Sequence, residues 1–219
     1  HDQAHCPRCD RLVVQAAEGE LLNCDIGPAT KAAAIFLRYG MRLSYRKVQE
    51  LFDVFFGMPF VHVSAMNFDR TATEKGEPLY EDLKQKLRAS AIAYADETHW
   101  REDAQNMYVW YGGNDDLGLF RIDPTRSSEA ATDNHAEQAL RSPVIFRKLC
   151  FGTRSAAGSR SHSVLPSLLL TAQRQNHHPL QFFRSLLTTD TPPLKPYSSM
   201  THPELPQLAR PLRTRASRG

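Results

Sequence analysis

The chain has 219 residues, 41% of them hydrophobic and 23% charged. These values exclude a wholly disordered protein and allow one domain of ordinary size or two small ones. No stretch approaches the roughly 18 uninterrupted apolar residues of a membrane-spanning helix, no signal peptide is visible, and four cysteines are too few for a disulfide-stapled secreted scaffold. We therefore expect no membrane partner and a reducing, cytoplasmic location. Because the chain opens at His1 rather than methionine, we also expect a truncated N-terminus.

The net charge of +3 is divided unevenly along the chain. Residues 1–137 hold 15 Lys and Arg against 22 Asp and Glu, whereas residues 138–219 hold 12 against 2. A basic C-terminal part attached to an acidic body predicts a polyanionic partner, with nucleic acid the first candidate. A solvated, arginine-rich tail without a partner is equally compatible with this division.

The first 26 residues contain the sequence Cys6-Pro-Arg-Cys9, which has the spacing of one zinc knuckle. A closed structural Zn²⁺ site needs four ligands, and a second pair of this kind is absent. His1, His5 and Cys24 are further candidates, although nothing fixes their spacing. We predict a partial knuckle-like segment over residues 1–26, with Cys6 and Cys9 as half of a zinc site.

Residues 27–78 have the apolar period of helices. A first helix ends at Gly40, Ser44 caps a second, and Gly57 ends that one before Ser64 caps a third running through Phe68. A helix, a glycine turn and a helix are compatible with a helix-turn-helix that reads DNA. They are equally compatible with an ordinary helical hairpin that buries phenylalanines.

Residues 79–131 begin with a charged amphipathic helix to Ala89 and then change period. Apolar stretches at 91–95, 107–111 and 117–122 predict three strands of a meander, with turn residues at 112–116. Helical patterns return at 134–141, 161–175 and 179–187, and the proline-rich residues 190–219 predict a disordered basic tail. The expected fold class is α+β.

Two carboxylates are candidates for chemistry. Asp96 ends the first predicted strand, where a structural carboxylate would cap the following turn. Glu137 lies four residues before Arg141, with which it would form an ion pair on a solvated helix face. If the two carboxylates converge instead, they supply the oxygen ligands that hard divalent cations need in two-metal phosphodiester chemistry.

Several short motifs occur in a fixed order. They are Asp25-Ile-Gly-Pro28, Leu43-Ser-Tyr-Arg-Lys-Val-Gln-Glu-Leu51, Phe56-Gly57, Ala95-Asp-Glu-Thr98, Trp100-Arg101, Val109-Trp110, Arg121-Ile-Asp-Pro-Thr-Arg126, Asp133-Asn-His-Ala-Glu137, Ala139-Leu-Arg141, Arg147-Lys148 and Phe151-Gly152. In this order they resemble the transposases of the insertion sequence 66 family. The resemblance implies a DDE transposase with a ribonuclease-H-like core, in which Asp96 is the first and Glu137 the last ligand of Mg²⁺ or Mn²⁺. It also implies that the N-terminal knuckle ends a Zn²⁺-binding element and that the helices of residues 27–78 bind DNA.

One departure from the family pattern is large. The family's middle aspartate lies on a later strand, but here the chain passes from Arg126 through Ala131 directly to Thr132. The resemblance therefore predicts an internal deletion, an incomplete core with an exposed strand edge or sheet face, and a truncated or inactive copy. The alternatives are a non-catalytic DNA-binding remnant that competes with the full-length transposase, and an unfolded remnant.

The resemblance and the charge together divide the chain into five segments. These are the partial knuckle (1–26), the helical DNA-binding-like region (27–78), the N-terminal and C-terminal parts of the catalytic core (79–131 and 132–189) and the basic tail (190–219). The expected partners are the element's DNA ends, target DNA, and a second copy or the full-length transposase, in a bacterial cytoplasm at the nucleoid. The residues expected to contact phosphates are Arg141, Arg147, Lys148, Arg154 and Arg160.

Overall fold

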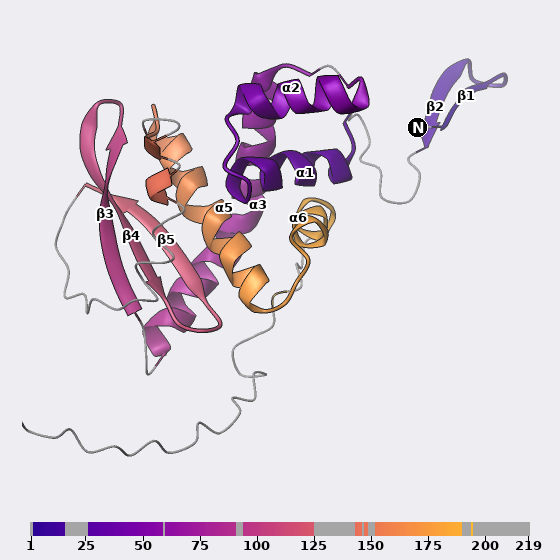
Figure 1. Cartoon of the computed structure of the whole chain (residues 1–219). Coiled ribbons are helices and arrows are strands. Elements are labelled where there is room, and N and C mark those ends of the chain that lie inside the picture. Colours follow the sequence, from indigo (N-terminus) through magenta and orange to yellow (C-terminus); the bar gives the residue numbers. More distant parts are fainter. Residues whose placement is uncertain are drawn as a thin grey trace, which may run out of the picture.

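The computed structural model of the chain describes residues 2–15, 26–58, 60–90, 94–124, 143–145, 147–148, 152–189 and 194. It contains a small N-terminal hairpin and a body in which helices cover one side of a three-stranded sheet (Figure 1). This arrangement confirms the α+β prediction. The predicted helix at 134–141 and the tail lie outside the described residues, apart from residue 194.

The helices and strands have the following bounds. They are β1 (Asp2–Cys6), β2 (Arg11–Gln15), α1 (Pro28–Tyr39), α2 (Tyr45–Phe56), α3 (His62–Ala89), β3 (Tyr94–Glu102), β4 (Gln105–Gly113), β5 (Gly118–Asp123), α5 (Ala156–Arg174) and α6 (Pro179–Thr188). Strands β1 and β2 pair antiparallel, and β3, β4 and β5 form an antiparallel meander in that order. The predicted meander and the predicted helices at 161–175 and 179–187 are therefore confirmed.

The ends of α2 follow from local chemistry. The Ser44 hydroxyl accepts a hydrogen bond from the backbone N–H of Lys47 at 3.3 Å, which confirms the predicted N-cap. Gly57 ends the helix in the left-handed conformation, with φ of 57°, which a glycine adopts at no steric cost.

Helix α3 differs from the sequence prediction. It begins at His62, not at a Ser64 cap, and it runs without interruption across the predicted segment boundary between residues 78 and 79. Pro78 lies inside it and removes one helical hydrogen bond. Helix α3 is nevertheless buried along one side before and after the proline, at Ala72, Gly76, Tyr80 and Leu83. This burial outweighs the local helix-breaking signal.

The first strand of the meander also differs from its prediction. Strand β3 is Tyr94–Glu102, so Asp96 is its third residue and not its end. The strand continues past Asp96 because the residues that follow it alternate between a buried and an exposed face. Trp100 is buried against the helices while His99 and Arg101 are exposed on the other face, which is typical of a half-buried strand.

The outer edge of β5 is closed by hydroxyl groups of α5. The backbone N–H groups of Gly118, Phe120 and Ile122 donate to side-chain oxygens of α5 at 3.1, 2.7 and 3.1 Å. The acceptors are Thr171, Ser167 and Ser163, in that order. Four helical residues rise about 6 Å and two strand residues about 6.7 Å, so the two repeats stay in step. Of the two predicted alternatives, an exposed strand edge or an exposed sheet face, the first does not hold for β5, because a helix takes the place of a neighbouring strand.

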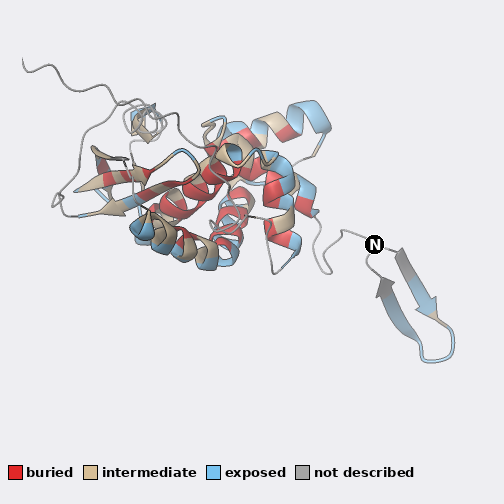
Figure 2. Ribbon diagram, turned by 90° about the horizontal axis from the view of Figure 1, so that it is seen from below, coloured by how far each residue is buried: buried red, intermediate tan, exposed pale blue. Residues whose placement is uncertain are grey.

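The main core lies between α1, α3, α5 and α6, and a smaller cluster lies between the sheet and α5. Figure 2 shows the buried residues along the helices that face one another. A short segment after the undescribed residues joins the end of β3, where the backbone N–H of Thr153 donates to the Arg101 carbonyl at 2.8 Å. Gly152 is required there, because its φ is 102° and a Cβ would lie 2.1 Å from that carbonyl oxygen.

Candidate functional site

Asp96 is the one predicted metal ligand of the sheet that the described residues include. It is half-buried, and its Cα lies opposite that of Tyr111 on the face of the sheet that carries Trp100. One carboxylate oxygen accepts the backbone N–H of Glu97 at 2.7 Å. Carboxylate oxygens are the ligands that Mg²⁺ and Mn²⁺ prefer.

Glu137, the predicted partner carboxylate of Asp96, and Arg141 lie outside the described residues. Within the described part of the chain, no group of three His, Cys, Asp or Glu side chains is placed to hold a metal ion. Asp123 is not placed to act as the middle aspartate that the family resemblance implies. It lies on β5, one strand beyond β4, on the face opposite to Asp96, and forms an ion pair with Arg121.

The N-terminal hairpin places Cys6 at the end of β1 and Cys9 in the turn before β2. Hydrogen bonds from the backbone N–H groups of Arg8 and Cys9 lower the pKa of the Cys6 thiol, which favours the thiolate form that binds Zn²⁺. His5 lies next to this turn and pairs with Asp10 at 3.0 Å. The two cysteines fit half of a tetrahedral zinc site, and the described residues supply no third ligand.

Helices α2 and α3 follow one another through a short connection that contains Phe60. The Phe60 ring centroid lies 5.2 Å from that of Phe52 on α2 and 5.9 Å from that of Phe68 on α3. The Gln49 side chain accepts the backbone N–H of His62 at 3.1 Å and ties α2 to the start of α3. The first turns of α3 expose one continuous face, made of Val63, Met66, Asn67, Arg70, Thr71 and Glu74.

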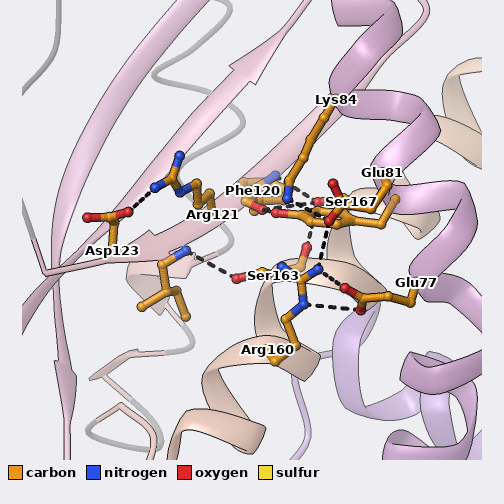
Figure 3. Close-up of polar contacts among 11 residues, drawn as sticks. Glu77, Glu81, Lys84, Phe120, Arg121, Asp123, Arg160, Ser163 and Ser167 are labelled. Carbon is orange, nitrogen blue, oxygen red and sulfur yellow. Dashed lines mark hydrogen bonds and ion pairs between the residues drawn. The ribbon is translucent and has the colours of Figure 1, made fainter.

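The predicted phosphate-contacting residues differ in exposure and in their hydrogen-bond partners. Lys148 and Arg154 are exposed, and the Arg147 guanidinium donates to the backbone carbonyl of His99 at 2.6 Å. Arg160 instead points to α3, where it donates to Glu77 at 3.1 Å and to Glu81 at 3.0 Å (Figure 3). Its guanidinium also lies 4.7 Å from the centre of the Tyr80 ring. Because two carboxylates engage its charge, we leave Arg160 out of the proposed DNA contacts.

The ion pairs of Arg160 give a testable result. We expect Arg160→Gln to lower the free energy of unfolding by about 1 kcal/mol, because it removes half-exposed ion pairs and a cation–π contact between α5 and α3. The same substitution should leave DNA affinity and its salt dependence unchanged. Urea unfolding and DNA titrations between 50 and 200 mM salt measure the two effects. The matched variant Arg154→Gln should give the opposite pattern, and a DNA defect for Arg160→Gln alone would contradict the assignment.

A buried polar network escaped sequence analysis. Asp69 on α3 is 2% exposed, and one of its carboxylate oxygens accepts hydrogen bonds from the hydroxyls of Tyr39 at 2.9 Å and Tyr45 at 2.5 Å. Burial raises the pKa of Asp69 to about 6, although the two tyrosines and Arg38 oppose the shift. The ring of His162 lies 5.2 Å from that of Tyr39 between centroids, and partial burial, together with the nearby charge of Arg38, lowers the pKa of its imidazole to about 3.

Comparison with known proteins gives one family. A sequence model described as "Transposase IS66 family" matches residues 24–133, half of the chain, from the approach to α1 to ten residues past β5. The chain belongs to the IS66 transposase family. Membership implies DNA binding in general and indicates a role in transposition. No curated protein matches the chain, and no solved structure does. Among the described helices of this IS66-family chain, none is long and apolar enough to cross a membrane.

Proposed function

We propose that the chain functions in DNA transposition as a duplex-DNA-binding member of the IS66 transposase family, and that α2 and α3 form its DNA-reading element. The observation that carries this proposal is the exposed face of α3 within the matched range. Asn67, Arg70 and Thr71 lie there next to each other on successive turns, and Arg46 and Lys47 are exposed at the start of α2.

The chemistry of these residues suits a duplex. Asn and Arg side chains form the paired hydrogen bonds that distinguish adenine and guanine in the major groove. In a helix-turn-helix the second helix enters the groove while the first crosses the backbone, so the cations of α2 would lie at phosphates.

Strand cleavage is the finer part of the proposal. Asp96 and Glu137 are the residues that would hold Mg²⁺ or Mn²⁺, which in this chemistry activates the attacking oxygen and stabilises the leaving one. The described residues include only Asp96 of this pair, so we derive no step through a metal. Zn²⁺ at Cys6 and Cys9 would be structural and would need two further ligands.

A non-catalytic role is the second candidate. The position of Asp123 on the wrong face of the sheet favours it, because the described part of the chain then offers no substitute for the middle aspartate. The matched range ends at residue 133, two residues past the junction at which the internal deletion is expected. Such a chain would occupy the element's ends and compete with a full-length transposase.

Selection of DNA from a random-sequence duplex pool tests the DNA-reading element. The wild-type chain is expected to enrich one sequence, and Arg70→Ala to weaken binding of that sequence about 5- to 150-fold, the worth of one good base contact. The control is Gln85→Ala, an exposed residue at the far end of the same helix. The proposal fails if nothing is enriched, or if both variants bind the enriched duplex like wild type.

A nicking assay on the enriched duplex separates the two candidates. With 5 mM MnCl₂, a chain that retains transposase chemistry nicks the DNA, and Asp96→Asn abolishes nicking while duplex affinity stays unchanged. A non-catalytic binder shows no nicking in either form. We expect the second result, because metal sites of this kind normally need three carboxylates to hold two cations.

A further inference from the structure

The meander has a second face, turned away from α3 and α5, which the proposed function does not use (Figure 1). Its side chains come from alternate residues of the three strands. They are Glu97, His99 and Arg101 on β3, Asn106, Tyr108 and Trp110 on β4, and Leu119, Arg121 and Asp123 on β5. We call these nine residues the outer face. The register places His99 opposite Tyr108 and Arg101 opposite Asn106.

A basic hollow of about 550 Å³ lies at the edge of β3, next to one end of the outer face. Its lining residues are His99, Trp100, Arg101, Asn106, Arg147 and Lys148. Arg101 and Lys148 are exposed, and the hydrogen bond from Arg147 to the His99 carbonyl holds the residue 147–148 segment against the edge of β3. The described lining residues include no carboxylate, so the hollow is complementary to an anion.

Aromatic rings lead from this hollow along β4. The ring of Tyr108 is half-exposed and lies 5.3 Å from that of His99, and Trp110 follows two residues later on the same face. A second hollow, of about 310 Å³, begins at Trp110 and is lined also by Gly112, Leu119 and Arg121. From Asn106 to Gly112 the strand covers about 20 Å.

We propose that the outer face binds an unpaired segment of DNA, with its phosphates in the basic hollow and successive bases stacked on Tyr108 and Trp110. Cations beside exposed rings on a sheet are the combination that single-stranded nucleic acids bind, whereas the bases of a duplex are stacked on one another and cannot reach such rings. The outer face carries two carboxylates. That of Asp123 is paired with Arg121, whose side chain points with it away from α5 (Figure 3). That of Glu97 lies opposite Trp110 and does not line the basic hollow. The inference goes beyond the proposed function, which assigns duplex recognition to α2 and α3.

Binding of a fluorescein-labelled 12-nucleotide oligothymidylate to the full chain tests the stacking. We expect Tyr108→Leu to weaken binding at least about fivefold, the lower end of the worth of one stacked base. Phe36→Leu removes a similarly half-buried ring from α1, which belongs to neither proposed DNA-binding surface, and should bind like wild type. The two tryptophans provide a second readout, because Trp110 lies on the outer face and Trp100 is buried on the other. The unlabelled oligonucleotide should quench tryptophan emission in wild type but not in Trp110→Phe.

The salt dependence tests the basic hollow. The double variant Arg101→Gln/Lys148→Gln should reduce the slope of log affinity against log salt by about 0.7 for each lost phosphate contact. Arg184→Gln, an exposed cation on α6, should leave the slope unchanged. Wild-type binding of the oligonucleotide by Tyr108→Leu and by the double variant, both with wild-type unfolding curves, overturns the inference.

The two proposals fail separately. Duplex binding that depends on Arg70, together with no binding of the oligonucleotide, overturns the outer-face inference and leaves the helix-turn-helix intact. If oligonucleotide binding depends on Tyr108 and the duplex selection enriches no sequence, the outer-face inference is supported and the assignment of duplex recognition to α2 and α3 is contradicted.

Discussion

Asp69→Asn and His162→Gln are expected to change the pH dependence of stability in opposite directions. Between about pH 4 and pH 6, we expect the free energy of unfolding of Asp69→Asn to rise with pH, relative to wild type, by about 1 kcal/mol per pH unit. Over the same range, the free energy of unfolding of His162→Gln should fall by a similar amount per pH unit. Across the two pH units each difference reaches about 2 kcal/mol, because the proton difference is partial near the ends of the range.

The sign for Asp69 follows from its raised pKa. The folded protein binds the proton with a pKa of about 6, and an unfolded aspartate with one near 4. Between these values the folded state holds one proton more than the unfolded state. The contribution of Asp69 to stability is therefore complete below about pH 4 and is lost as the pH rises through 6.

The sign for His162 is the reverse. Its folded pKa of about 3 lies below the unfolded value of 6.5, so between them the unfolded state holds the extra proton. The contribution of His162 is complete above pH 6.5 and is lost as the pH falls. In wild type the two groups cancel between about pH 4 and 6, and each substitution exposes the other's slope.

Urea unfolding followed by the fluorescence of the buried Trp100 measures these slopes at pH 4.5, 5.0, 5.5 and 6.0. In Asp69→Asn the amide oxygen keeps an acceptor for both tyrosine hydroxyls, since both donate to one carboxylate oxygen. Asp53→Asn, an exposed carboxylate on α2, is the matched control and should follow wild type. Parallel curves for wild type and both buried variants would contradict the assigned protonation states.

The sequence predicts those features of the fold that neighbouring residues determine, and it does not predict those that depend on contacts between distant residues. The cap at Ser44, the turn at Gly57 and the meander were predictable, because adjacent residues determine them. The continuity of α3 through Pro78 was not, since it depends on burial against α5, whose residues lie about 85 positions later. A prediction from neighbouring residues alone includes the hydrogen bond that Pro78 removes but not the distant burial that offsets its loss.

The candidate site divides in the same way. Asp96, Glu137 and the two cysteines are recognisable by motif and spacing. The net charge of residues 138–219 does not distinguish Arg147 from Arg160. In the structure, Arg147 lies at the edge of β3, whereas Arg160 is bound by Glu77 and Glu81. Sequence reasoning missed the outer face because Arg101 and Lys148 meet only in three dimensions. The alternation of Tyr108 and Trp110 in β4 was the available signal.

The hydroxyls of α5 lead to the second large expected effect. The helical pattern predicted over residues 161–175 rests on the spacing of its leucines and assigns no role to the serines between them. We expect Ser167→Ala and Thr171→Val each to lower the free energy of unfolding by about 1–3 kcal/mol, because each leaves a buried backbone N–H of β5 without its acceptor. Shape changes little in either substitution, so the loss reports the hydrogen bond and not a cavity.

The control is Thr188→Val at the end of α6, where the hydroxyl bonds only to carbonyls of its own helix and is exposed. It should change stability by less than about 0.5 kcal/mol. The double variant Ser167→Ala/Thr171→Val should also aggregate more readily than wild type, because it uncovers the unpaired edge of β5 to a strand of another molecule. Light scattering at increasing protein concentration measures this. If the double variant matches Thr188→Val in stability and light scattering, then the packing of α5 protects the edge of β5 without its hydroxyl groups.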